Sequence, residues 1–182
     1  MQPWAADLRK KRANAYDNPD ALCLPQGPLE YHLDPQPREI VQLPRKILIV
    51  YESNYGLRTI YMDGRSLPPQ GRPQPYWHGY SVGRWEGDTL VIDINNFSED
   101  TWLADDGLFH SKNMHVVERV RRDGNAIQWS VVVEDPAVLQ EPWKMTPRTL
   151  KLMTNTEIEE APPCNEKDLS IMQDLTHHHN TR

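Results

Sequence analysis

Hydrophobic and polar residues alternate along several short stretches of the chain. The clearest stretch is 81–95 (SVGRWEGDTLVIDIN), where two alternating runs flank a tight Glu86-Gly87-Asp88 turn. Alternation with a period of two is typical of a half-buried β-strand, and a short glycine-containing turn between two such runs predicts a β-hairpin. We expect two further hairpins, at 47–62 and 114–134, and one more strand at 144–153.

The strand pattern favours an all-β fold. About eight strands follow one another in the chain, which makes an antiparallel meander the simplest topology. Eight strands can close into a lipocalin-like (calycin-type) barrel with room for one small ligand. A two-sheet sandwich is the alternative, because periodicity does not distinguish closure from stacking. Residues 4–16 have apolar positions at helical spacing and predict a short N-terminal helix that serves as a lid or an edge cover.

The length and composition predict a single domain over 1–182. The chain has 182 residues, of which 38% are hydrophobic, so it can form a hydrophobic core that does not depend on disulfides or metals for stability. Its 16 prolines lie mainly between the predicted strands, as expected for loops. Within the domain we expect an irregular N-terminal arm at 1–37, which includes the helix, and a C-terminal tail at 162–182.

Charge and composition exclude several classes of partner. The net charge is -6 and the basic clusters are short, which argues against nucleic acid. No apolar run approaches the roughly 18 residues of a membrane span. No dinucleotide or phosphate-loop fingerprint is present, so no organic cofactor is expected. We expect a small-molecule ligand or substrate as the partner and leave a homodimer open.

The two cysteines lie near opposite ends of the chain. Cys23 and Cys164 both occur in proline-containing loops. This placement suits a disulfide that ties the N-terminal arm to the tail and contributes roughly 3 to 5 kcal/mol in the chain-entropy model. Two separate buried thiols are the alternative.

Three charged residues fall on predicted apolar strand faces. By alternation, Glu118 shares a face with Val116 and Val120, Glu52 with Leu48 and Val50, and Arg58 with Ile60 and Met62. A carboxylate that points into an apolar interior has a raised pKa, which suits acid–base chemistry. The alternative is a buried Glu–Arg ion pair that fixes strand register.

His110 is the strongest single catalytic candidate. It lies beside Ser111 in the long stretch 96–112, just before the strand that carries Glu118. Imidazole exchanges protons near neutrality, and long loops on a rigid scaffold often carry function. We therefore pair His110 with Glu118 as acid–base groups and expect Arg58 or Arg65 to hold a negative charge. An ordinary surface histidine is the alternative.

A metal site is the weaker interpretation of the same region. The candidate ligands would be His78, His110, His115 and Glu118. Their spacing matches no recognised ligand pattern, and His115 and Glu118 point to opposite faces of one strand. We therefore expect no metal.

Aromatic residues suggest where a ligand would contact the protein. The chain has six tryptophans and only two phenylalanines. Flat amphipathic rings form good walls for sugars or aromatic ligands. The candidate wall residues are Tyr51, Trp77, Tyr80, Trp85 and Trp102. For Trp85, Trp129 and Trp143 the alternative role, filling the barrel core, is favoured.

The segment 79–92 (GYSVGRWEGDTLVI) resembles a large family of uncharacterised exported proteins from environmental bacteria. The resemblance covers nearly the whole chain and includes 23–27, 40–44, Tyr51-Glu52, 63–65, 101–103, His110-Ser111, 117–119, Asp135-Pro136, Pro142-Trp143 and 164–168. It implies a shared scaffold and a secreted or periplasmic location, with an export signal removed before Gln2. The family usually has Gly-His-Pro-His-Ser where this chain has Gly107-Leu-Phe-His-Ser111, so only the second histidine is present.

Three functional hypotheses follow. The first is an exported enzyme with acid–base chemistry in a barrel cavity, acting as a lyase, isomerase or hydrolase without an organic cofactor. The second is a non-catalytic, lipocalin-like binding protein for a sugar or an aromatic small molecule. The third is an interaction module with an exposed apolar patch.

Overall fold

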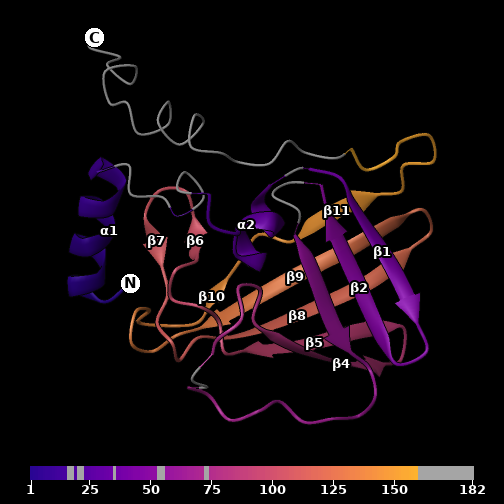
Figure 1. Ribbon diagram of the computed structural model, residues 1–182, viewed down its shortest axis with the longest axis horizontal. Helices are drawn as coiled ribbons and strands as arrows, with labels where there is room; N and C mark the ends of the chain where they lie inside the picture. Colours follow the sequence, from indigo (N-terminus) through magenta and orange to yellow (C-terminus); the bar gives the residue numbers. More distant parts are fainter. Residues whose placement is uncertain (16–18, 20–22, 35, 53–55, 72–73, 160–182) are drawn as a thin grey trace.

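The computed structural model describes residues 1–15, 19, 23–34, 36–52, 56–71 and 74–159 (Figure 1). Over these residues the fold is all-β, with one strongly curled sheet that has the shape of a half-barrel. The order of strands across this sheet is β1-β2-β3-β4-β5-β8-β9-β10, and β11 also pairs with β9. The prediction of an all-β fold with a barrel-like sheet is therefore confirmed.

The elements have the following bounds. The curled sheet contains β1 (Arg38–Leu43), β2 (Lys46–Tyr51), β3 (Leu57–Tyr61), β4 (Tyr80–Glu86), β5 (Thr89–Asn95), β8 (His115–Asp123), β9 (Ala126–Glu134), β10 (Trp143–Lys144) and β11 (Arg148–Lys151). A separate two-stranded sheet contains β6 (Trp102–Ala104) and β7 (Leu108–Phe109). The two helices are α1 (Pro3–Ala15) and α2 (Pro28–Leu33).

The three predicted hairpins are present. The strands β4 and β5 are antiparallel, and their last pair is Glu86 with Thr89, so Gly87 and Asp88 form the turn. Gly87 has φ +63°, a conformation that glycine adopts without strain. The hairpins β2–β3 and β8–β9 are also antiparallel. Short turns between alternating runs were thus enough to predict these pairings.

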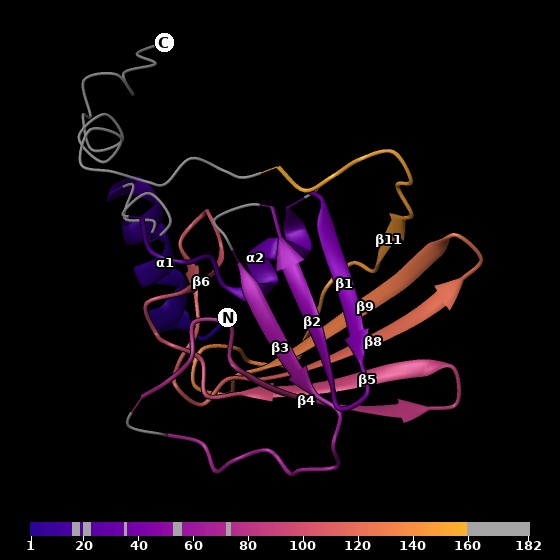
Figure 2. The ribbon, with the colours of Figure 1, turned by 45° about the vertical axis from the view of Figure 1, so that its right-hand side comes forward.

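The predicted antiparallel meander is wrong at one junction. β3 and β4 pair in parallel, through only two residue pairs, Ile60 with Ser81 and Tyr61 with Val82. A parallel neighbour needs a long connection, and the proline-rich segment after β3 provides it. Figure 2 shows β1, β2 and β3 lying over the strands β4, β5, β8 and β9. Among the described strands β1 pairs only with β2, so the sheet curls without closing.

The concave face of the sheet carries the core. Buried residues alternate along β2 as Ile47, Ile49 and Tyr51, and Ile92 and Trp129 are buried on β5 and β9. The sequence had predicted that Leu48, Val50 and Glu52 face inward, and this register is wrong by one residue. Both faces of β2 are apolar, so the alternation of this strand did not indicate which face is buried.

The predicted N-terminal helix is present as α1, and it covers the β6–β7 hairpin. Ala5 is fully buried, Trp4 lies 5.8 Å from the Phe109 ring, and the Arg12 guanidinium lies 4.6 Å above that ring. Arg9 forms an ion pair with Asp106, in the turn between β6 and β7. The helix therefore anchors this hairpin at one end of the fold (Figure 1).

The second helix, α2, was not predicted. It begins at Pro28, and the Gly27 amide donates a hydrogen bond of 2.8 Å to the Glu30 carboxylate. The helix lies against the concave face of the sheet, where Tyr31 stacks on Tyr51 at 4.0 Å between ring centroids. It thereby fills one end of the curl. Neither α1 nor α2 is long and apolar enough to cross a membrane, and these are the only helices in the described part of the chain.

Candidate ligand-binding site

A cavity of about 1260 Å³ lies within the curled sheet. Small-molecule sites typically occupy roughly 300 to 1,000 Å³, so a ligand of considerable size fits. The aliphatic part of the wall comes from strands on both halves of the sheet: Ile47, Ile49, Ile60, Leu90, Ile92, Val120, Ile127 and Leu150. Charged side chains, including Asp34, Glu39, Asp88, Lys151 and Glu157, also line the cavity. The strand alternation produces this lining, because residues two apart project to the same face.

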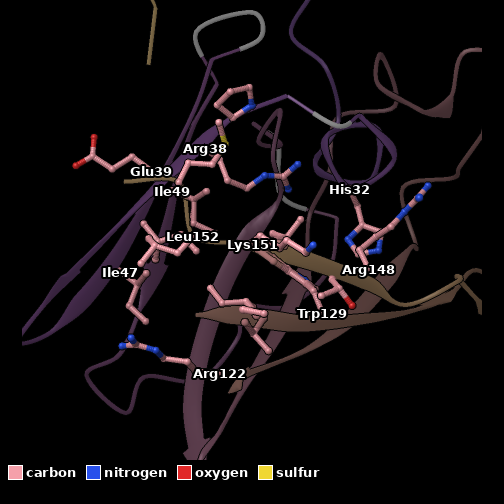
Figure 3. Close-up of a pocket in the computed structure, with 18 of the residues that line it drawn as sticks. His32, Arg38, Glu39, Ile47, Ile49, Arg122, Trp129, Arg148, Lys151 and Leu152 are labelled. Atoms are coloured by element: carbon pink, nitrogen blue, oxygen red, sulfur yellow. The ribbon is translucent and has the colours of Figure 1, made fainter. Parts of the chain in front are cut away.

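Five apolar residues that line the cavity are also exposed to solvent, and one of them is Leu33, which is 37% exposed. The exposed fractions of the other four are 39% for Ile40, 51% for Trp85, 61% for Leu152 and 55% for Met153. Figure 3 shows Leu152 on the same side of the cavity as Ile47 and Ile49. Single exposed apolar residues are ordinary, whereas a group at the border of a cavity is a candidate binding surface.

The end of the cavity beside α2 is polar. Arg38 lines this end, and its Nη2 donates hydrogen bonds to the carbonyl oxygens of Tyr31 (2.7 Å) and Asp34 (3.0 Å). Its guanidinium also lies 5.3 Å from the Tyr51 ring and 5.9 Å from the Trp129 ring. These contacts hold the cation in a defined position at the last turn of α2, where positive charge is favourable.

Two buried polar atoms at this end have no hydrogen-bond partner among the described residues. They are Nε2 of His32 and Nε1 of Trp129, and their side chains both line the cavity. The residues are only 6% and 2% exposed. An unsatisfied buried polar atom typically costs about 1–3 kcal/mol, so such atoms are often kept for a ligand or a water.

Burial lowers the pKa of His32, and the nearby Arg38 and Arg148 lower it further. The Glu118 carboxylate and a hydrogen bond with the Thr146 backbone oppose this change. The net direction is downward, so the neutral imidazole is favoured near neutral pH. Burial is the largest cause of the lowered pKa, and among the charges that act on His32 the Glu118 carboxylate has the largest effect, followed by Arg38 and Arg148.

Beneath α2, Arg58 and Glu118 form a buried ion pair. The Nη1 of Arg58 lies 2.9 Å and 3.1 Å from the two carboxylate oxygens, and its Nε donates to the Ser81 hydroxyl at 3.1 Å. Both residues are 1% exposed. Burial lowers the pKa of Arg58, but Glu118 and Tyr51 outweigh this effect and the net direction is upward. The alternative interpretation of these residues, a buried Glu–Arg pair, is what the structure shows.

His110 is buried elsewhere in the fold. Its Nε2 lies 3.0 Å from the Thr101 hydroxyl and its Nδ1 lies 3.0 Å from the Ser111 carbonyl oxygen. Burial lowers the pKa of His110. Among the described residues no hydrogen bond or ion pair joins His110 to Glu118, and neither residue is among those that line the cavity. The stretch 96–112, which contains β6 and β7, lines no part of this cavity either.

The remaining polar candidates lie outside the cavity. Arg65 forms an ion pair of 2.6 Å with Asp63 and donates a hydrogen bond of 2.9 Å to the Tyr80 hydroxyl. The hydrogen bond from Arg65 lowers the pKa of Asp63 to about 2. Glu52 follows the end of β2, is partly exposed, and accepts a hydrogen bond of 3.0 Å from the Glu159 amide.

The aromatic candidates occupy several different places. Trp85 borders the cavity, and Tyr51 lies beneath α2. Tyr80 stacks on Tyr61 at 5.1 Å, away from the residues that line the cavity. Trp102 is buried beside α1, where the Arg12 guanidinium lies 5.7 Å from its ring, and Trp77 is exposed. The structure thus brings only Trp85 of this group to the cavity wall.

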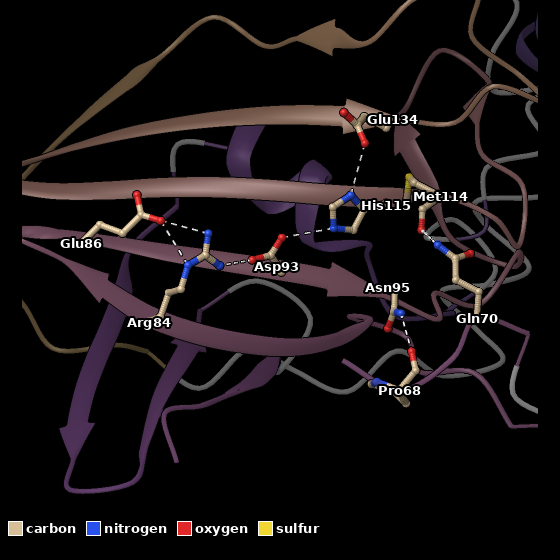
Figure 4. A network of polar contacts seen from close by, with 9 residues as sticks. All are labelled: Pro68, Gln70, Arg84, Glu86, Asp93, Asn95, Met114, His115 and Glu134. Carbon is tan, nitrogen blue, oxygen red and sulfur yellow. Dashed lines mark hydrogen bonds and ion pairs between the residues drawn. The ribbon is translucent and has the colours of Figure 1, made fainter. Parts of the chain in front are cut away.

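The histidines considered as metal ligands lie apart. His115 is on the outer face, within 3.3 Å of Asp93 and 3.4 Å of Glu134, in a network that also includes Arg84 and Glu86 (Figure 4). His78 lies beside Tyr31, with 5.6 Å between ring centroids. Over the described part of the chain, no group of three or more His, Cys, Asp or Glu side chains is arranged to hold a metal ion. Cys164 is outside the described residues, so its disulfide with Cys23 stays a prediction.

Comparisons with protein-family models, with curated proteins and with solved structures find no match for this chain. The functional argument therefore depends on the cavity itself. Sequence reasoning missed three residues at its polar end, His32, Arg38 and Arg148, and considered Trp129 only as a core residue. The Gly27-Pro28 start and Glu30 were the available signal for α2, because proline at the first position and an acid in the first turn are typical of a helix start.

Proposed function

We propose that this protein binds a small, mainly apolar molecule inside the curled sheet. The observation that carries the proposal is the cavity of about 1260 Å³, with aliphatic walls and an exposed apolar border. Removing apolar ligand surface from water contributes roughly 25 cal/mol per Å². This is the binding-protein hypothesis, with the family resemblance adding the proposal that binding takes place outside the cytoplasm.

The geometry favours binding over acid–base catalysis. Glu118 is held by Arg58, and His110 already has contacts at both ring nitrogens. Neither lines the cavity, so a ligand there would not reach either group. The enzyme hypothesis stays a prediction that needs a second site.

The cavity walls also favour one class of ligand. A sugar would bury many hydroxyls, and aliphatic residues such as Ile47, Ile60 and Ile92 offer them no hydrogen bonds. A hydrocarbon body has no polar groups of its own to desolvate where it lies against these aliphatic residues. We therefore favour a hydrocarbon-rich ligand over the sugar that the sequence had suggested.

The test uses N-phenyl-1-naphthylamine, a neutral dye whose fluorescence rises in apolar sites. Ile47→Trp places a large ring in the cavity, whereas Leu48→Trp places the same ring on the opposite face of β2. We expect the parent and Leu48→Trp to bind the dye and Ile47→Trp to bind at least about tenfold more weakly. Leu150→Trp, at a partly exposed lining position, repeats the test with less risk to the core.

Absence of dye binding by the parent protein would reject the proposal. Equal binding by Leu48→Trp and both cavity variants, with circular dichroism showing all of them folded, would place the dye elsewhere and would reject it as well.

A further inference from the structure

We infer that the end of the cavity beside α2 binds the oxygen anion of an amphipathic ligand, with a carboxylate as the simplest such head group. This inference rests on the proposed function, because it names the chemical class of the molecule in the same cavity. The residues that would hold the head group are Arg38, Arg148, Trp129 and His32.

The first support is the excess of donors at this end. Guanidinium and indole groups donate hydrogen bonds and accept none. Trp129 Nε1 is buried without a partner among the described residues, and it belongs to a residue that lines the cavity. Arg148 pairs with Trp129 across β11 and β9, which places both on adjacent strands. These donors therefore need a ligand group that is rich in acceptor oxygens.

The second support is the pair of arginines, neither of which forms an ion pair among the described residues. Neither Arg38 nor Arg148 is ion paired with a carboxylate within the described part of the chain, whereas Arg84 and Arg119 on the outer face both are. Of the two acids that act electrostatically on Arg38, Asp34 forms no ion pair with it among the described residues and Glu118 is already held by Arg58. Charge-assisted hydrogen bonds to an oxygen anion are about twice as strong as neutral ones, so this end selects an anion over a neutral head group.

His32 completes the site. Its Nε2 is buried, unpartnered and on the wall of the cavity, and Figure 3 shows His32, Arg148 and Trp129 on one side of the cavity. The imidazole can accept a hydrogen bond from a protonated head group, or take up a proton and donate to an anion. In either form it adds a polar contact beside the two arginines.

The lining of the cavity indicates where the hydrocarbon part of the ligand would lie. Ile47, Ile49 and Leu152 lie on the side opposite His32 and Trp129 (Figure 3), and further aliphatic residues line the space between. A hydrocarbon chain that starts at the arginines would run along these residues toward the exposed border at Trp85. An unbranched or alicyclic monocarboxylate has this combination of head and body.

The experiment compares decanoate with 1-decanol, which have the same number of carbons and differ in the charge of the head group. Each displaces N-phenyl-1-naphthylamine from the full chain, and the displacement midpoint is measured. We expect decanoate to displace the dye at a concentration at least about tenfold lower than 1-decanol.

Variants locate the head group. Arg148→Gln and Trp129→Phe should raise the displacement midpoint of decanoate by about tenfold. The midpoint of 1-decanol should stay within a factor of about two of the parent value. Arg122→Gln is the matched control, because Arg122 also lines the cavity and also has no ion pair within the described residues, but it does not act on His32. We expect it to leave both ligands unchanged. Arg38→Gln tests the second cation. It carries a greater risk to the fold than Arg148→Gln, because Arg38 also donates hydrogen bonds to the end of α2.

The outcomes separate the two proposals. If the parent protein binds the dye but decanoate and 1-decanol compete equally, the anion site is wrong and the binding function stands. If Arg122→Gln weakens decanoate binding as much as Arg148→Gln does, the positive charges of the cavity attract the anion without a specific site. The anion site would then also be wrong. Failure of the parent to bind the dye at all would reject the binding function itself.

Discussion

Arg58 and Glu118 join two strands that are not neighbours in the sheet. Arg58 is on β3 and Glu118 is on β8, with β4 and β5 between them in the strand order. The pair therefore crosses the interior of the curl. It links the two parts of the sheet that meet at the parallel junction of β3 and β4, where only two residue pairs connect them. We infer that this ion pair stabilises the curvature that forms the cavity.

The first prediction is that Glu118→Gln lowers the free energy of unfolding by about 3–5 kcal/mol, because it leaves the buried Arg58 charge without its partner. Glu86→Gln is the control, since the exposed ion pairs of Glu86 with Arg119 (2.6 Å) and Arg84 (3.0 Å) should contribute far less to stability than a buried pair. Urea unfolding monitored by tryptophan fluorescence measures both.

The double variant Arg58→Met with Glu118→Leu removes both charges. It should regain much of the stability lost in Glu118→Gln, because no unpaired charge is left in the interior. A loss in Glu118→Gln as small as that in Glu86→Gln would contradict the role we assign to the pair.

The second prediction concerns acid. Burial lowers the pKa of His78 to about 4 from 6.5, with Arg58 lowering it further. The unfolded chain therefore binds a proton at a higher pH than the folded protein. Neutral His78 therefore contributes fully to the free energy of unfolding above pH 6.5. This contribution, roughly 3 kcal/mol, is lost as the pH falls from 6.5 toward 4.

Urea unfolding at several pH values between 7 and 4 checks this prediction. His78→Gln should show a shallower decrease than the parent. Part of the decrease should persist, because burial also lowers the pKa of His32 and of His110. An identical pH dependence in parent and variant would show that His78 does not contribute.

The third prediction separates backbone strain from crowding at two glycines. Gly79 and Gly87 have φ +68° and +63°, so alanine at either should cost about 1–2 kcal/mol. A Cβ at Gly79 would lie 2.6 Å from Ile94 and 2.7 Å from Phe97, whereas a Cβ at Gly87 would have nothing within 4 Å. Gly79→Ala should therefore cost about 1–3 kcal/mol more than Gly87→Ala. Thermal unfolding of the two variants measures the difference. Equal losses of stability would show that the side chains around Gly79 shift to accommodate the added methyl group.

The fourth prediction distinguishes the binding protein from the enzyme. His110→Ala should leave the affinity for N-phenyl-1-naphthylamine unchanged, because His110 does not line the cavity. It should lower stability, since the contacts of the imidazole with Thr101 and Ser111 are buried. The enzyme hypothesis instead predicts that, once a substrate is found, turnover falls by about 10²–10⁴-fold in this variant. Fluorescence titration and a melting curve are the two measurements.

The sequence by itself determined the local structure. Alternating runs separated by short glycine turns specify the three hairpins, because the period of two and the turn geometry are both encoded within a few residues. The same alternation correctly placed Arg58 and Glu118 on an inward face. It failed at β2, where Ile47, Leu48, Ile49 and Val50 are apolar on both faces and burial depends on what packs against them.

Only the tertiary structure decided what these elements enclose. The parallel junction of β3 and β4 and the position of α2 depend on contacts between segments far apart in the chain, which local periodicity does not record. They gather His32, Arg38 and Arg148 around Trp129 at one end of a cavity whose lining includes neither His110 nor Glu118. Residue types indicate which chemistry is available, but the curvature of the sheet and the helix inside it determine which side chains meet.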